Sequence, residues 1–293
     1  MTRRLTVFPP PQAPPHLYQQ VPAIKRIREA YQKRFEVTVF GWPFFDNAGA
    51  RSPDDVVSTL GDALSPGGFV VAEAPAVTAL LVALDNGARR PDAFVAVGLD
   101  PTNATMRSLG LGEVVEAAKR ITDHEGRLRQ VKSFLSDVVG DLALLSELDR
   151  EVPWEAVFAF EDWIEEVDQL TLGPFEDVIG LVFTSSMFPL LAEGETEHVF
   201  QRIFPNSRSA HVEQYPRGLD NPSTGDEVTT VVIPFLESVS AAGSNGAAVE
   251  APMIPESSLK SSGEVGAGSL ARPNRSWEAG PYMWGGVWRL RRR

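Results

Sequence analysis

Short apolar segments alternate with helical patterns through the first hundred residues, and this alternation limits the fold more than any other feature. The helical pattern is clearest where Val21, Ile24, Ile27 and Tyr31 recur on one face of a basic segment. Strands that alternate with helices form parallel sheets, and all-apolar strands are buried on both sides. The predicted strands are Leu5–Phe8, Glu36–Phe40, Phe69–Ala72 and Ala93–Gly98, and the predicted helices between the later ones are Ser52–Leu64 and Pro75–Asp85. The sequence therefore predicts an α/β fold.

The segment that begins at Ser52 carries a complete helix-start signal. The Ser52 hydroxyl can accept a hydrogen bond from a free backbone N–H, and Pro53 has a backbone angle suited to the first turn. Asp54 and Asp55 place negative charge at the positive end of the helix dipole.

Residues 102–170 depart from the alternation, because their patterns are helical and lack a strand signal. Helices are predicted near Leu111–Thr122, Arg127–Leu148 and Trp154–Val167. Strand and helix patterns return at Val178–Phe183, Thr196–Phe204, Ser209–Val212 and Glu227–Val239. We therefore expect a core of residues 1–101 and 171–239 with a helical cap, residues 102–170, inserted into it.

Residues 240–293 are rich in Ala, Gly, Ser and Pro, and we expect a disordered tail. Their end combines Tyr282, Trp284 and Trp288 with four arginines. This composition suits contact with a surface or an anionic membrane. An extension without a function explains it equally well.

Charge and composition exclude several classes of function. The net charge is −12, and residues 240–293 hold seven Lys and Arg against four Asp and Glu, which leaves −15 for residues 1–239. Such an acidic body argues against nucleic acid and against an anionic membrane surface. The longest apolar run, Phe69 to Leu84, is too short and too interrupted for a membrane span. With no cysteine and no secretory start, we expect a cytoplasmic protein.

The order of elements over residues 4–239 resembles the α/β-hydrolase family with a helical cap. The most similar stretch is Phe69–Gly98, which resembles the family's nucleophile strand, elbow, helix and following strand. This resemblance implies a mainly parallel sheet flanked by helices, with catalytic residues on loops at the carboxyl ends of the strands.

The catalytic positions depart from the pattern of that family. The G-x-S-x-G elbow reads Ala72-Glu73-Ala74-Pro75-Ala76, so the nucleophile position holds Ala74, whose methyl group cannot attack. The family takes one oxyanion donor from the next backbone N–H, and Pro75 has none. In the loop Phe8–Pro15, which should supply the second donor, five of eight residues are prolines.

The acid and the histidine of the family are also missing from their expected loops. The loop Thr184–Pro189 contains no carboxylate, and the segment 213–227, before the last helix, contains no histidine. The resemblance therefore implies a degenerate member without the Ser-His-Asp triad, and we assign no catalytic residue by it.

Three titratable residues are weak acid/base candidates, each with an ordinary alternative. Glu73 could act as a general base or bind a ligand. The ordinary alternative is a carboxylate that the free N–H groups of a helix start stabilise. Asp100 could lie at the same end of the sheet as a second candidate, or it could cap a helix. His16 could be a histidine of the site, or it could be exposed at a helix start. The four histidines show no metal-binding spacing, so we expect neither a metal nor a cofactor.

Aromatic residues could line an apolar pocket between the sheet and the cap, although core packing is the alternative for each. The predicted ligand-binding residues are Trp42, Phe44, Trp154 and Phe158, with Thr184 and Ser185 at the floor. The acidic run at Glu161–Glu166 is interpreted as a solvated helix face or as a docking face for a basic partner.

Three functional hypotheses follow. The first is a non-hydrolytic protein that binds a small apolar molecule or a protein partner. The second is an enzyme of altered chemistry, such as a lyase, isomerase or cyclase acting on a hydrophobic metabolite, or residual esterase activity. The third is an interaction module in which residues 240–293 act as a tether.

Overall fold

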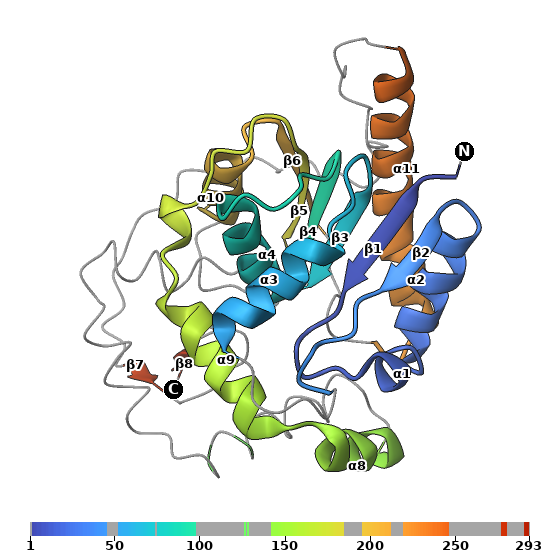
Figure 1. Cartoon of the computed structure of the whole chain (residues 1–293). Helices are drawn as coiled ribbons and strands as arrows, with labels where there is room; N and C mark the ends of the chain where they lie inside the picture. Colours follow the sequence, from blue (N-terminus) through green and yellow to red (C-terminus); the bar gives the residue numbers. More distant parts are fainter. Residues whose placement is uncertain are drawn as a thin grey trace, which may run out of the picture.

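The computed structural model describes residues 2–45, 52–73, 75–97, 126, 128, 142–184, 195–211, 219–245, 277–279 and 290–292. Six parallel strands form its central sheet, in the order β2-β1-β3-β4-β5-β6 (Figure 1). The strands are β1 (Arg4–Phe8), β2 (Glu36–Val39), β3 (Phe69–Glu73), β4 (Ala93–Val97), β5 (Ile179–Thr184) and β6 (Ser207–His211). The predicted parallel α/β sheet is confirmed.

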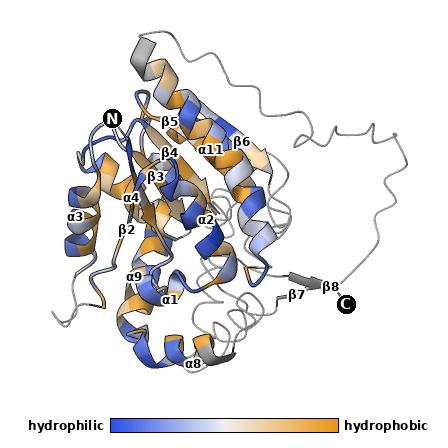
Figure 2. Cartoon of the chain, turned by 90° about the vertical axis from the view of Figure 1, so that its right-hand side faces the viewer, coloured by the Kyte–Doolittle hydropathy of each residue, from blue (hydrophilic) through white to orange (hydrophobic). Residues whose placement is uncertain are grey.

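Helices cover both faces of the sheet. One face carries α1 (Pro15–Tyr18), α2 (Pro22–Gln32) and α11 (Pro222–Asn245). The other carries α3 (Pro53–Ala63), α4 (Ala76–Asp85) and α10 (Glu195–Ile203). Figure 2 shows α2 and α11 in front of the sheet, with hydrophilic colours on the exposed side of α2.

Alternation along the strands builds two separate cores. In β3, Phe69 and Val71 contribute to the core beneath α2 and α11, whereas Val70 and Ala72 contribute to the core beneath α3 and α4. This follows from the two-residue period of a strand, which sends successive side chains to opposite faces. Glu73 continues the series of Phe69 and Val71 and therefore belongs to the α2 face.

The helix signal at Ser52 is confirmed as a capping box. The backbone N–H of Asp55 donates to the Ser52 hydroxyl, and the backbone N–H of Ser52 donates to the Asp55 carboxylate, both over 3.2 Å. These two bonds satisfy donors that an uncapped helix end leaves without partners.

Two helices lie beyond the carboxyl end of the sheet: α8 (Leu142–Glu151) and α9 (Trp154–Glu166) (Figure 1). A short helical turn, η1 (Gln169–Thr171), leads back to the sheet. The predicted helix Leu111–Thr122 and most of Arg127–Leu148 lie outside the described residues, so the cap boundaries stay a prediction.

Three findings correct the expectations from sequence. Helix α11 begins at Pro222 and continues past residue 240 to Asn245. Within the predicted disordered tail, β7 (Trp277–Ala279) and β8 (Leu290–Arg292) pair antiparallel. Finally, Glu161 and Glu165 are buried in α9, so the acidic run is not a uniformly solvated face.

Candidate functional site

The elbow region has the strand, turn and helix that the sequence predicts. Strand β3 ends at Glu73, and Pro75 stands at the N-cap position of α4, which begins at Ala76. Ala74, at the nucleophile position, lies outside the described residues. The missing N–H of Pro75 follows from its covalent structure, so this turn lacks one backbone donor that an oxyanion site of this kind uses.

The loop after β1 lies beside the elbow, because Phe8 and Ala72 are register partners in adjacent strands. The Trp42 indole N–H donates to the Pro9 carbonyl over 2.8 Å, which fixes the proline-rich loop to the end of β2. Gln12 in this loop is buried, and its amide nitrogen and oxygen have no hydrogen-bond partner among the described residues. The sequence analysis missed Gln12 because a pattern of residue types does not show whether a surface loop buries its polar side chain.

Glu73 points toward α1 and away from the α4 core. The Tyr18 hydroxyl of α1 donates a hydrogen bond to the Glu73 carboxylate. Tyr18 is almost fully buried, whereas Glu73 is half-buried. Glu73 is therefore held on the α2 face of the sheet by a phenol that the sequence analysis did not single out.

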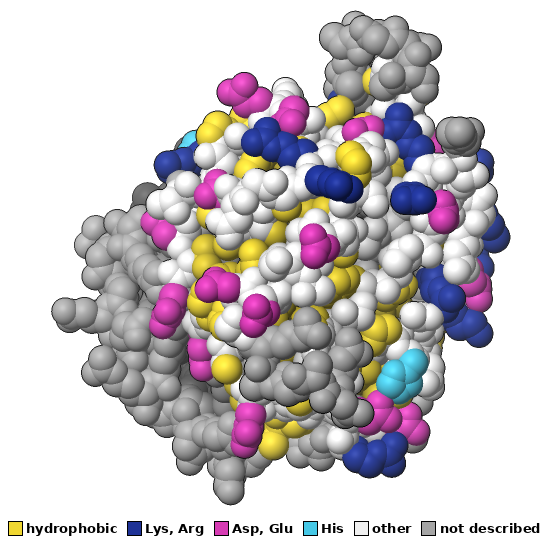
Figure 3. Space-filling view, in the orientation of Figure 1, with side chains coloured by type: hydrophobic (Ala, Val, Ile, Leu, Met, Phe, Trp, Pro, Cys, Tyr) yellow, Lys and Arg dark blue, Asp and Glu magenta, His cyan; other side chains and the backbone are white. Residues whose placement is uncertain are grey.

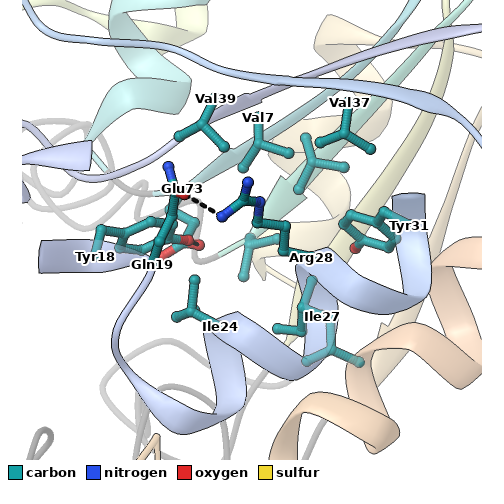
Figure 4. A pocket seen from close by; sticks show the side chains of 13 residues that line it. Val7, Tyr18, Gln19, Ile24, Ile27, Arg28, Tyr31, Val37, Val39 and Glu73 are labelled. Atoms are coloured by element: carbon teal, nitrogen blue, oxygen red, sulfur yellow. Dashed lines mark hydrogen bonds between the residues drawn. The ribbon is translucent and has the colours of Figure 1, made fainter. Parts of the chain in front are cut away.

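A pocket surrounds Glu73 on this face, between α2 and the strands β1 to β4 (Figure 4). Its polar residues are Tyr18, Gln19, Arg28, Tyr31 and Glu73. Its walls are aliphatic and comprise Val7, Ile24, Ile27, Val37, Val39, Val71, Val97 and Val228. About 20 Å³ is open to the centre of a water molecule, and the space reaches about 460 Å³ when its open mouth is included.

Tyr31 forms part of the pocket wall. Its side chain is 1% exposed, and its hydroxyl has no hydrogen-bond partner among the described residues. Burial, and secondarily the negative charge of Glu73, raise the pKa of Tyr31 far above its usual value, so this phenol stays protonated. It is a hydrogen-bond donor facing a mostly apolar space.

Of the three acid/base candidates the structure describes two, His16 and Glu73, and these have different partners. His16 Nε2 lies 2.9 Å from a Glu151 carboxylate oxygen of α8, and the histidine side chain is 61% exposed. Glu73 instead bonds to Tyr18, which lies two residues beyond His16 in α1. Asp100 lies outside the described residues. His16 thus links α1 to α8 at the surface.

The predicted pocket aromatics fall into two packed groups. Trp42 stacks on Phe44 with ring centroids 5.7 Å apart, and both rings contact Phe160 of α9. Trp154 and Phe158 pack on each other at 5.7 Å within the core beneath α2. Both groups join α9 to the sheet. Thr184 ends β5 in register with His211, and Ser185 lies outside the described residues.

The described residues contain no cluster of three acidic or histidine side chains suited to a metal ion. None of the described helices combines the length and apolar character that crossing a bilayer requires.

Solved structures with similar folds come from several bacterial enzymes. MenH from S. aureus is 13% identical, with a TM-score of 0.57 over 82% of this chain and 96% of its own. A hydrolase from Oleispira antarctica is 12% identical, with a TM-score of 0.57 over 81% of this chain and 92% of its own. A thermophilic esterase from Thermogutta terrifontis is 14% identical, with a TM-score of 0.56 over 82% of this chain and 91% of its own.

These neighbours have the α/β-hydrolase fold, and the sheet order and helix placement described above show that this chain has it too. The sequence matches no family model and no curated protein. At such low identity the likeness concerns the fold alone.

Proposed function

We propose that this α/β-hydrolase-fold chain binds a small, largely apolar molecule or a protein partner and does not hydrolyse it. One observation carries the proposal. The strand-turn-helix of the elbow is retained, but its sequence places Ala74 at the nucleophile position and Pro75 at the oxyanion-donor position. Attack requires a nucleophilic atom, and loss of one oxyanion donor alone costs roughly 3–4 kcal/mol in barrier height.

The proposed binding residues for an apolar molecule at the carboxyl end of the sheet are Trp42, Phe44, Trp154 and Phe158, with Thr184 and Ser185. Their support is position: α9 brings aromatic rings over the ends of the strands, and Phe160 lies against both Trp42 and Phe44. Apolar walls with a few hydroxyl groups are typical of small-molecule sites. Trp42, Trp154 and Phe158 are buried, and Phe44 is half-buried.

A turnover assay tests the proposal. Purified chain is incubated with p-nitrophenyl esters and acyl thioesters of increasing chain length, and the expected rate equals the rate without protein. Hydrolysis that disappears in Ser185→Ala or Glu73→Gln would show that another group has taken the role of the nucleophile or base, and the proposal would then fail.

An enzyme of altered chemistry is the second candidate, and the hydrogen bond between Tyr18 and Glu73 favours it. A carboxylate and two phenols around an aliphatic pocket can move a proton without a nucleophile. His16 is paired with Glu151 and does not line this pocket, so such chemistry would depend on Glu73 and the tyrosines. Isomerisation or elimination that is lost in Glu73→Gln and in Tyr18→Phe alike would support this candidate.

A further inference from the structure

The pocket beneath α2 contains a cation that has no acidic partner among the described residues. Arg28 donates to the Gln19 side-chain oxygen and forms no ion pair with any described residue. Its neighbours differ: Arg26 pairs with Asp226 at 2.7 Å and Arg34 pairs with Glu237 at 3.6 Å. Arg28 is also half-buried and lines the pocket, whereas Arg26 is exposed.

The walls around this cation are aliphatic. Ile27, Val37 and Val39 are half-buried at the open side, and Val7, Val71 and Ile24 lie deeper. Figure 4 shows the Arg28 side chain among the labelled valines, with its hydrogen bond to Gln19 drawn. A guanidinium at one end of an aliphatic space is complementary to a carboxylate on a short hydrocarbon chain.

The negative charge of Glu73 determines how a ligand is oriented in the pocket. Glu73 would repel a carboxylate, so the acid group of a ligand must stay at the mouth with Arg28 and Gln19. The hydrocarbon chain then extends toward the valines of the sheet. An α-ammonium group on the ligand would face Glu73, while the protonated Tyr31 hydroxyl can donate to a polar atom that reaches the inner end.

The size of the pocket limits the length of the ligand's hydrocarbon chain. Only about 20 Å³ of the pocket is open to the centre of a water molecule, far below the about 300–1,000 Å³ of pockets for drug-sized molecules, so the pocket suits only a small ligand. A branched chain of about five carbons can enter only if Ile27 and Val39, both half-buried, shift outward. Helix α2 carries Lys25, Arg26 and Arg28, and Figure 3 shows basic side chains on the side where Figure 1 places α2 as well as across the top of the molecule. Positive charge near the pocket favours the approach of an anion.

We propose that this pocket binds a short, branched aliphatic carboxylate, with Arg28 holding the acid group and the valines of β1, β2 and β3 contacting the chain. This inference deepens the proposed non-hydrolytic binding function and rests on it. It gives that function a site on the α2 face, separate from the aromatic groups under α9.

The test is a titration of the full chain, labelled with ¹⁵N, with sodium isovalerate, followed by amide chemical shifts. We expect saturable shifts at α2 and β2. Isovalerate should bind more tightly than acetate, which lacks the branched hydrocarbon chain, and more tightly than 3-methylbutan-1-ol, which lacks the charge. L-leucine is titrated in parallel: tighter binding identifies an amino acid, and weaker binding identifies an acid without the ammonium group.

Arg28→Gln should weaken isovalerate binding by roughly tenfold or more, because it removes a charge-assisted contact. The matched control is Arg26→Gln on the same helix, which should leave binding unchanged. Ile27→Trp keeps the charge but narrows the mouth, and it should also reduce binding. Equal effects of the two arginine variants, or no saturable shift with isovalerate, would overturn the inference.

A second assay separates this inference from the proposed function. Release of p-nitrophenolate from p-nitrophenyl isovalerate would refute the non-hydrolytic function while leaving the isovalerate site in place. Absence of both isovalerate binding and ester turnover would refute the site alone.

Discussion

Tyr31 shows how one buried hydroxyl determines a pH dependence. Its folded-state pKa is raised by burial and by Glu73, so the unfolded chain releases this proton at a lower pH than the folded chain does. Above the usual tyrosine pKa of 10.0, the folded state therefore binds more protons, and stability falls as pH rises. Below that pH the contribution is fully present.

We predict that Tyr31→Phe removes this dependence. The wild-type free energy of unfolding should decrease above pH 10 by up to about 1.4 kcal/mol per pH unit more than that of the variant. Urea unfolding at pH 8, 9, 10 and 11 measures the difference. Parallel curves for the two proteins over this range would contradict the assignment.

Gln12 permits a second prediction at the residue scale. Burial of an amide without partners is unfavourable, so Gln12→Leu should raise the free energy of unfolding by about 1–2 kcal/mol. The matched control is Gln169, which is also buried but donates to the Thr78 hydroxyl over 2.7 Å. Gln169→Leu should lower stability. Thermal unfolding of both variants measures these changes in stability. A loss of stability in both variants would mean that the Gln12 amide has hydrogen-bond partners in solution.

The pairing of α2 with α11 depends on one position at the scale of elements. A Cβ atom at Gly225 would lie 2.5 Å from the backbone oxygen of Ala23, closer than side chains approach in proteins. The Ala23 N–H also donates to Leu219 O over 2.9 Å, so the two segments are held together and cannot easily separate. Glycine is thus required here for close approach.

Gly225→Ala tests this contact. In an unconstrained helix the change would favour folding by about 1 kcal/mol, but the clash should reverse the sign and cost about 1–3 kcal/mol. Gly225→Val should cost more. Ser223→Ala, at an exposed position of the same helix, is the control and should change little. Chemical denaturation provides the free energies, and a stabilised Gly225→Ala would show that α2 and α11 do not meet this closely.

Elements were predictable from sequence where a local cause determines them. The capping residues at Ser52 and the all-apolar strand Ala93–Val97 both depend on neighbours in the chain, and both were predicted. Helix α1 was missed because four residues after a proline cluster carry no periodic signal. Burial of Glu161 and Glu165 was missed because it depends on what packs against α9, which its own sequence does not specify.

The site was less predictable for the same reason. The elbow follows from a linear motif, so Pro75 was placed correctly at the helix start, whereas Glu73, expected after the strand, is the last residue of β3. The pocket beneath α2 joins residues from α1, α2, four strands and α11. Tyr31 was predicted only as a residue of a helix, and Tyr18 and Arg28 were not singled out. Their shared pocket arises from the tertiary packing of separate elements.

Hydrolysis in an α/β-hydrolase fold is a property of the whole molecule, because its parts come from loops after different strands. Here the loop after β3 has Ala74 and Pro75, the loop after β1 has five prolines in eight residues, and residues 213–227 contain no histidine. Restoring one part should therefore restore little. This differs from an enzyme inactivated by a single substitution, in which returning one side chain restores the reaction.

We predict that Ala74→Ser alone shows no ester turnover and no labelling by a fluorophosphonate probe. A serine needs a base to become nucleophilic, and the oxyanion would still lack the donor that Pro75 cannot supply. Ala74→Ser with Pro75→Gly returns the nucleophile and one backbone N–H but still no histidine, so labelling should stay at background. An intact serine hydrolase labelled in parallel verifies the probe. Labelling of the single variant would mean that a base and two donors already surround the turn, and the fold would then be one substitution from activity.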